Sequence, residues 1–398
     1  MVIKELVILS SLLVIIIKCE PNYERIDCNS ATFLYPCRCL NDPRNEAKVE
    51  TINCTGGPLE LKQISQELND RLLGDRKYPK SYKIQKLVIQ NTPIQQIRSK
   101  VFERIPFVEI IIKDNHELHY IDRNAFNGSA DSLEVINLID NRKLAEASHT
   151  AADLWILLSK FVKLREIKVT GNGITSIPSH AFRSVDGQRD RLKHIDLSHN
   201  QIHTIGDFAF EALTSPSLDL IFSHNKIRTI GKNVFRFQES REVIRMIDLS
   251  HNQLYSQSFD VESFSRMGRP LAILSLKDNK MDALSEKTFG PLFDRSDKNY
   301  FVLEVVGNNI HCDCPLGWTV RTKYCYTDKS VPVSHQIVSL KCGPKSISQY
   351  DFSYCSQMEE RLSPSCRTSG HNTAIPLLQT NHKLFAFTIM SALIMFSF

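Results

Sequence analysis

The stretch His194 to Ile202, HIDLSHNQI, decides the fold of this chain. Together with Leu192 it reads L-x-x-L-x-L-x-x-N-x-L, in which isoleucine also occupies leucine positions. Apolar and polar residues alternate before Asn200, as they do in a strand that buries one face. The asparagine follows the strand, where a short amide can satisfy backbone N–H and C=O groups of a neighbouring turn of the chain. A single copy would indicate little, so repetition is the test of the pattern.

The pattern recurs about nine times along the chain. The residues at the asparagine position are Thr92, Asn115, Asn141, Asn172, Asn200, Asn225, Asn252, Asn279 and Asn308, at intervals of 23, 26, 31, 28, 25, 27, 27 and 29 residues. Most copies continue with an apolar residue and then a phenylalanine, namely Phe102, Phe126, Phe182, Phe210, Phe235 and Phe289. We expect these rings to fill the convex side of each coil. Because one register persists from Ile84 to Ile310, unrelated α/β elements are rejected as the explanation.

This pattern resembles the leucine-rich repeat. The resemblance implies an α/β solenoid, a leucine-rich-repeat horseshoe of about nine repeats with a parallel β-sheet on its concave face and disulfide-bonded caps. We place the repeats at residues 81–310. The interval between Asn141 and Asn172 also carries apolar residues at helical spacing. It predicts a convex helix within Ala145 to Lys163, with Thr150 as its N-cap.

Charge and cysteine usage narrow the class of protein. The formal net charge is +5 over 398 residues, and no run of lysine or arginine suggests a nucleic-acid partner. None of the eleven cysteines lies between Cys54 and Cys312. Cys19 belongs to a predicted leader, and the other ten form an even set. Such a set is typical of a disulfide framework in an oxidising compartment.

The cysteines that flank the repeats resemble the caps of extracellular leucine-rich-repeat proteins. The N-terminal cap (residues 20–80) has the spacing C-x8-C-x-C-x14-C, which alone allows three connectivities, and the C-terminal cap (residues 311–366) begins with CDCPLGW. The resemblance implies burial of Trp318 and the pairs Cys28–Cys39, Cys37–Cys54, Cys312–Cys342 and Cys314–Cys355. Cys325 and Cys366 depart from this pattern. They are the two cysteines left after these four pairs, and we pair them with each other on that basis.

Within these proteins, the stretches PCRC, CDCPLGW and KCGPKSISQYDFSYC are most similar to arthropod proteins grouped with the non-catalytic subunit of oplophorus-type shrimp luciferase. Such a subunit is not the catalyst. The resemblance therefore implies a binding or stabilising role, without light production.

The two ends of the chain indicate a secreted or anchored protein. Residues 1–19 are predicted to be a signal peptide. A polar linker (367–383) precedes an apolar tail (384–398), which is short for a membrane span and is typical of a GPI signal. Asn372 is the first choice for lipid attachment and Ser369 the second, with a single-pass anchor as the alternative. Sequons at Asn53 and Asn127 are candidate glycosylation sites.

No catalytic motif is present, so we expect a protein that is not an enzyme and needs no cofactor. The string HELH at His116 to His119 is one residue short of the zinc motif H-E-x-x-H. His199, His224 and His251 share one position in three successive repeats and could form a metal-binding or pH-sensitive strip. We prefer the interpretation that they are exposed turn residues.

The strongest functional prediction is a protein-binding concave face. In the middle repeats the outward residues are Arg165, Glu166, Lys168, Lys193, His194, Asp196, Asp219, Ile221, Arg245, Met246 and Asp248. Mixed charge with a few apolar side chains suits a protein ligand better than a phosphate chain or a lipid. We therefore predict a glycosylated, GPI-anchored recognition module used in adhesion, receptor or matrix contacts. The alternative is a secreted, non-catalytic stabilising subunit of an enzyme complex.

Overall fold

The computed structural model describes residues 35–42, 45–70, 83–145, 148–183, 189–294, 301–313, 316, 318–319, 337–338, 341–342 and 345–346. Several predictions of the sequence lie outside these residues. They are the signal peptide, the linker, the tail, the attachment sites Asn372 and Ser369, and the cysteines Cys28, Cys314, Cys325, Cys355 and Cys366.

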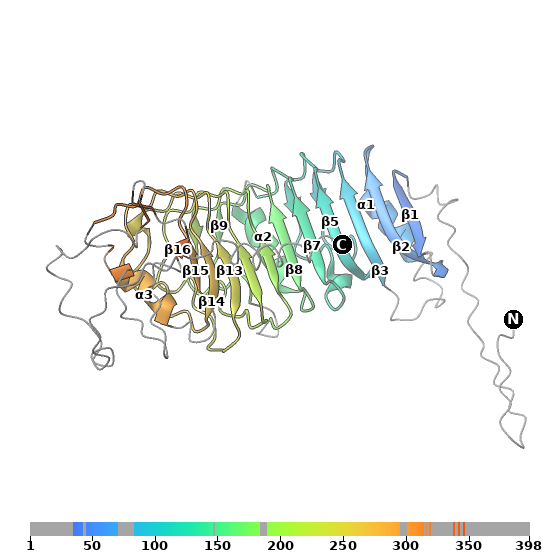
Figure 1. Ribbon diagram of the computed structural model, residues 1–398. Coiled ribbons are helices and arrows are strands. Elements are labelled where there is room, and N and C mark those ends of the chain that lie inside the picture. The colour runs from blue at the N-terminus through green and yellow to red at the C-terminus, as the bar shows by residue number, and fades with distance from the viewer. Residues whose placement is uncertain are drawn as a thin grey trace, which may run out of the picture. The chain divides into compact units, whose positions relative to one another are not determined.

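One large sheet dominates the described part of the chain (Figure 1). It contains twelve strands in the order β1-β2-β3-β5-β7-β8-β10-β12-β13-β14-β15-β16. These are β1 (Cys37–Asp42), β2 (Asn45–Thr55), β3 (Ile84–Gln90), β5 (Phe107–Lys113), β7 (Val135–Ile139), β8 (Glu166–Thr170), β10 (His194–Asp196), β12 (Leu218–Ile221), β13 (Ile244–Asp248), β14 (Leu271–Ser275), β15 (Val302–Glu304) and β16 (Ile337–Val338). Only β1 pairs antiparallel in this sheet, against β2, and every later pair is parallel.

The remaining elements lie between the strands of this sheet, except for β17 and β18, which follow its last strand and pair with each other. They are α1 (Leu61–Leu68), β4 (Gln96–Ile97), β6 (Tyr120–Ile121), η3 (Asn127–Ser129), α2 (Ser148–Ser159), β9 (Ser176–Ile177), β11 (Thr204–Ile205), η4 (Ser256–Ser258), α3 (Glu286–Asp294), β17 (Lys341–Cys342) and β18 (Lys345–Ser346). Strands connected by such convex segments, stacked coil upon coil, make the predicted leucine-rich-repeat solenoid.

The register of the sheet follows from the apolar period. Ile195 of β10 lies beside Ile167 of β8 and Leu220 of β12, and all three side chains are fully buried. Each coil therefore places the same repeat position next to its counterpart, so leucine and isoleucine form continuous columns under the sheet. This burial, repeated along the chain, is the main contribution to stability.

The asparagines connect neighbouring coils in the manner the sequence predicts. Asn225 Oδ1 accepts a hydrogen bond from the backbone N–H of Ile202 at 3.0 Å, and its Nδ2 donates to the Leu197 carbonyl at 3.0 Å. Both partners belong to the preceding coil. The same exchange holds for Asn252 and Asn279. The ladder satisfies backbone groups that would otherwise be buried without partners.

Aromatic rings fill the convex side. All six predicted phenylalanines are at most 1% exposed, and ring centroids of Phe182, Phe210 and Phe235 follow one another at 5.6 and 5.8 Å. Phe264, absent from the predicted set, continues this row at 6.1 Å from Phe235. The same repeat also buries Phe259, which is 6% exposed and lies 5.7 Å from Phe264 between ring centroids.

The predicted convex helix is α2, but its start differs from the prediction. The helix begins at Ser148, so Thr150 lies within the first turn and is buried rather than acting as the N-cap. Trp155 of this helix packs edge-on against Phe182, with ring centroids 5.6 Å apart. The helix thus supplies the aromatic contact that a phenylalanine supplies in the shorter coils.

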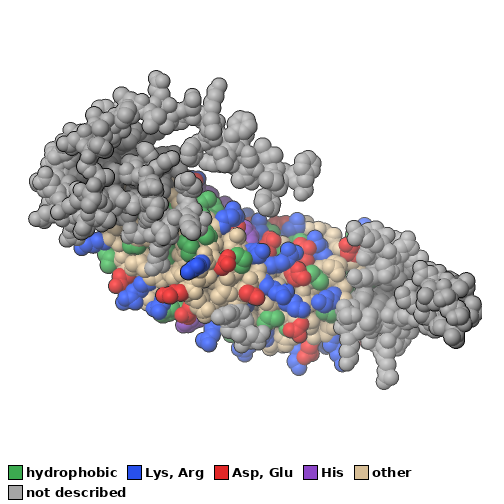
Figure 2. Space-filling model, turned by 60° about the horizontal axis from the view of Figure 1, so that its bottom comes forward, with side chains coloured by type: hydrophobic (Ala, Val, Ile, Leu, Met, Phe, Trp, Pro, Cys, Tyr) green, Lys and Arg blue, Asp and Glu red, His purple; other side chains and the backbone are tan. Residues whose placement is uncertain are grey.

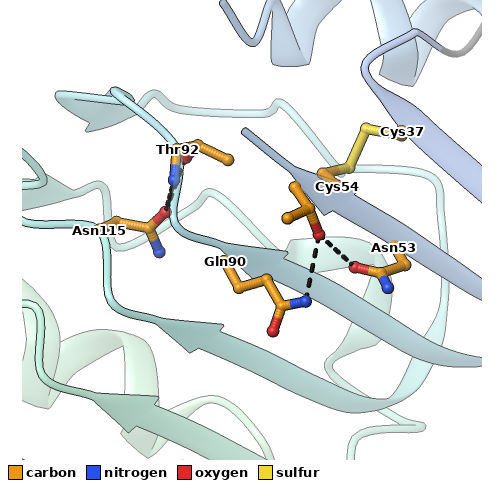
Figure 3. Close-up of a disulfide and its surroundings, with 7 residues drawn as sticks. Cys37, Asn53, Cys54, Gln90, Thr92 and Asn115 are labelled. Atoms are coloured by element: carbon orange, nitrogen blue, oxygen red, sulfur yellow. Dashed lines mark hydrogen bonds between the residues drawn. A yellow bond between two sulfur atoms is a disulfide. The ribbon is translucent and has the colours of Figure 1, made fainter. Parts of the chain in front are cut away.

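A disulfide between Cys37 and Cys54 joins β1 to β2, and it is one of the two N-terminal pairs that the resemblance implies (Figure 3). Cys39 and Cys312 are also disulfide-bonded.

The first and last repeats are held by hydrogen bonds at the two ends of the solenoid. At the junction with the first repeat, Thr92 takes the asparagine position, and its N–H and hydroxyl both donate to Asn115 Oδ1 (Figure 3). At the other end Trp318 is 2% exposed and donates to the Leu284 carbonyl at 2.9 Å, as expected for a residue that covers the last coil.

Candidate functional site

The concave face consists of strand residues that alternate with the core positions. Parallel pairing aligns Glu166, His194, Asp219 and Met246 in one row across β8, β10, β12 and β13. A second row contains Lys168, Asp196, Ile221 and Asp248 on the same strands. Arg165, Lys193 and Arg245 are exposed beside these rows. The structure therefore brings the predicted residues together on one surface.

Asp219 is the centre of this surface. Its Oδ2 lies 3.5 Å from His194 Nδ1 and also forms an ion pair with Arg245, so one carboxylate joins three adjacent strands. Asp219 is only 6% exposed, although the sequence predicts an outward residue, because these long neighbours lie over it. The hydrogen bond from His194 to Asp219 raises the pKa of the imidazole, and burial opposes that shift. Asp219 Oδ1 is buried without a hydrogen-bond partner.

The other charges of the face are mostly paired between neighbouring coils. The pairs are Lys86–Glu109 at 2.9 Å, Arg165–Glu134 at 2.8 Å, Lys168–Asp196 at 3.8 Å and Lys277–Glu304 at 2.7 Å. Figure 2 likewise shows basic and acidic side chains interspersed, without a large area of one sign on the face in view. Such a surface does not present the continuous positive track that nucleic acid requires.

Apolar side chains continue the first row beyond the predicted residues. Met246 aligns with Ile273 of β14 and then with Val302 of β15, and all three are partly exposed. Ile273 and Val302 were not among the predicted residues, although both occupy the repeat position of Met246. Extending the position to the last repeats would have found them. The apolar strip, as we call it, lies beside Asp219 and consists of Ile221, Met246, Ile273 and Val302.

A second apolar area lies nearer the N-terminal cap. Val88, Ile111 and Asn137 align in one row across β3, β5 and β7. Asn137 Oδ1 is buried and has no hydrogen-bond partner. The described concave face thus contains two buried acceptors without donors, on Asn137 and Asp219, each beside apolar side chains.

The histidine-containing motifs take part in ion pairs and ring stacking. In HELH, the Glu117 carboxylate pairs with Lys143 Nζ at 2.8 Å. The hydrogen bond from Lys143 and its positive charge lower the pKa of Glu117. His199, His224 and His251 are exposed and stacked. Partial desolvation of the His224 ring lowers its pKa first, and the charges of its two neighbours lower it further. Within the described residues, no group of three or more His, Cys, Asp or Glu side chains is arranged to hold a metal ion.

Both sequons lie on the described surface. Asn53 is partly exposed on β2, and its Oδ1 accepts from Thr55 at 3.0 Å (Figure 3). Asn127 is partly exposed in η3, whereas the sequon serine, Ser129, is fully buried. Glycosylation stays a prediction at both asparagines. Among the helices of the described residues, none combines the length and apolar character needed to cross a bilayer.

Two family models match parts of the chain. A leucine-rich-repeat model matches residues 190–254, and a BspA-type leucine-rich-repeat region of six copies matches residues 60–149. No curated protein matches the chain in sequence.

Three solved structures are similar to this chain at low sequence identity, and one of them has a TM-score above 0.5. A chain of the octameric complex of Latrophilin 3, Unc5D and FLRT2 has 15% identity and a TM-score of 0.51, covering 80% of this chain and 98% of its own length. Human 5T4, a trophoblast glycoprotein, has 14% identity and a TM-score of 0.32, with 68% and 76% coverage. A TLR13–ssRNA13 complex has 20% identity and a TM-score of 0.39, with 64% and 35% coverage. The fold is that of a leucine-rich-repeat solenoid.

Proposed function

We propose that this protein is an extracellular recognition module that binds a protein ligand on its concave face. The observation that carries the proposal is the junction of Asp219, its partners His194 and Arg245, and the apolar strip. Protein interfaces combine an apolar centre with satisfied polar groups at the rim. Solenoids use their extended sheet face for such contacts.

The chemistry of the face favours protein over other ligands. Most of its charges are paired, so a partner gains specificity by matching individual donors and acceptors rather than through net charge. The buried acceptors of Asn137 and Asp219 each lack a donor, which a polypeptide can supply with a backbone or side-chain N–H.

The test is an arrayed panel of extracellular domains from the same organism, probed with the mature chain. Met246→Glu places a carboxylate in the apolar strip, and Val261→Glu places one at a 57% exposed residue outside the sheet. We expect the Met246 variant to lose its ligands and the Val261 variant to keep them. Ligands that bind the Met246 variant as well as the wild type would show that recognition takes place elsewhere.

The proposed location is the outer surface of the plasma membrane, through a GPI anchor at Asn372 or Ser369. Phospholipase C treatment of intact expressing cells, followed by mass measurement of the released protein, tests this directly. Release with loss of residues beyond about 372 supports the anchor. A tail-less protein already in the medium, in stoichiometric complex with an enzyme, would favour the alternative role as a secreted stabilising subunit. Retention with an intact tail would indicate a single-pass protein.

A further inference from the structure

The residue before the asparagine position forms a column along one edge of the sheet. In six successive coils it is Asp140, Gly171, His199, His224, His251 and Asp278. Every member has a positive φ, between 51° and 69°. This left-handed conformation favours glycine and tolerates short polar residues. The turn therefore fixes these side chains one above another at the spacing of the coils.

The three imidazoles of the column form a continuous stack. Ring centroids lie 4.3 Å apart between His199 and His224 and 4.1 Å apart between His224 and His251, with planes within 10°. At one end the stack is closed by Asp278, whose Oδ2 lies 3.3 Å from His251 Nε2. At the other end the next coil contributes Gly171. One face of His199 is thus stacked on His224, and the other faces a position without a side chain.

A cavity of about 530 Å³ lies at this position. Its lining includes Asp140, Arg142, Thr170, Gly171, His199 and Gln201. The chain cannot fill the gap with a side chain at Gly171, because φ there is +69° and a Cβ atom would collide with the Asp140 carboxylate. The stack therefore ends at a cavity that has an aromatic wall on His199 and a hydrogen-bond acceptor on Asp140.

We propose that this cavity accepts a neutral aromatic side chain of a partner protein, tyrosine or tryptophan, as the next ring of the stack. The ring lies on the free face of His199, and its O–H or N–H donates to Asp140. Aromatic pairs prefer such offset stacks, and these two residues are enriched in protein interfaces because they join an apolar ring to a polar tip. This site is separate from the concave face and does not depend on the function proposed for it.

The charges of the cavity argue for a neutral ring. Asp140 and Arg142 line the cavity and contribute one charge of each sign. A guanidinium would stack on His199 equally well but would meet Arg142 at the same time. An aliphatic side chain would fill space without using either the ring face or the carboxylate.

The experiment is a titration of the mature chain, labelled with ¹³C-histidine, with N-acetyl-tyrosinamide at about pH 8, where free imidazoles are neutral. The His199 signal is assigned with the His199→Asn variant. We expect a saturable upfield shift at His199 and a smaller one at His251, which lies at the other end of the stack and pairs with Asp278 through Nε2. N-acetyl-leucinamide should produce no saturable shift.

Two matched variants test the role of the carboxylate. Asp140→Ala should weaken binding of the tyrosine amide about fivefold, since it removes an acceptor that is charged. Asp278→Ala, the equivalent change at the closed end of the stack, should leave the affinity unchanged. Absence of a saturable shift at His199, equal shifts with the leucine amide, or tighter binding of N-acetyl-argininamide would each overturn the proposal. Loss of affinity in the Asp278 variant equal to that in the Asp140 variant would overturn it as well.

Discussion

Arg269 Nη2 donates a hydrogen bond of 2.7 Å to the carbonyl oxygen of Ser215, two coils earlier in the solenoid. The same guanidinium donates to the carbonyls of Leu213 and Glu242, each at 2.9 Å. Arg269 is 1% exposed, so a charged side chain is held inside the convex coils by backbone acceptors. Arg189 repeats the arrangement with three carbonyls, and burial lowers its pKa to about 10. Each arginine fixes the stacking of successive coils.

Replacement of Arg269 by methionine should therefore destabilise the fold strongly. Two buried carbonyls, of Leu213 and Ser215, and the partly buried carbonyl of Glu242 lose their donors. Each buried group left without a partner costs roughly 1–3 kcal/mol. Removing the buried charge offsets only part of that cost. We expect the free energy of unfolding in urea to fall by about 3 kcal/mol. Arg266→Met is the matched control, because Arg266 is exposed and pairs with Glu262 at 2.9 Å, a contact worth about 0.5 kcal/mol or less. Equal losses in the two variants would contradict the role assigned to Arg269.

Asn225 should tolerate no apolar replacement. In Asn225→Leu, the N–H of Ile202 and the carbonyl of Leu197 both lose the partner that bridges the two coils. We expect a loss of roughly 2–4 kcal/mol, measured by urea unfolding. Asn309→Ala provides the comparison, since Asn309 is exposed and should change stability by less than about 0.5 kcal/mol. A leucine variant as stable as the wild type would mean that water replaces the amide.

The Cys37–Cys54 disulfide should stabilise the edge of the sheet locally. It closes a loop with a sequence separation of 17, for which the chain-entropy model gives about 3 kcal/mol. In a Cys37→Ser, Cys54→Ser double variant, amide hydrogen exchange should accelerate in β2 and β3, while β13 and β14 keep their protection, because repeats contact only their neighbours. Uniformly faster exchange along the sheet would show that the cap supports the whole solenoid.

The parts of the fold predicted from the sequence are those that repeat. Ile195, Asn200 and Phe210 each occupy a position that recurs with the coil, so periodicity alone identifies their neighbours and their burial. Asn137 and Ile273 occupy the same outward strand positions in repeats outside the predicted set, so the period also identifies them.

Features that depend on a single coil were not predictable in this way. Arg189 and Arg269 are polar residues between strands, and nothing in the repeat indicates that backbone carbonyls surround them. The burial of Asp219 is set by how His194 and Arg245 lie over it, and the gap at Gly171 depends on the direction taken by the Asp140 carboxylate. These are contacts between particular side chains, and the period does not encode them.

Two histidines should respond to pH in opposite directions. The pKa of His194 is raised by Asp219, so the stability it contributes is fully present below its unfolded value of about 6.5 and is lost as pH rises through its folded pKa. The pKa of His224 is lowered, by burial first and then by its stacked neighbours, so its contribution is present above the unfolded value and is lost as pH falls through its folded pKa. Histidine NMR titration measures both pKa values directly.

Two variants separate the causes of these shifts. Asp219→Asn should lower the pKa of His194 and leave the pKa of His224 unchanged. The double variant His199→Asn, His251→Asn should raise the pKa of His224 alone. If either variant moved both histidines together, the concave face and the histidine stack would be electrostatically coupled rather than independent.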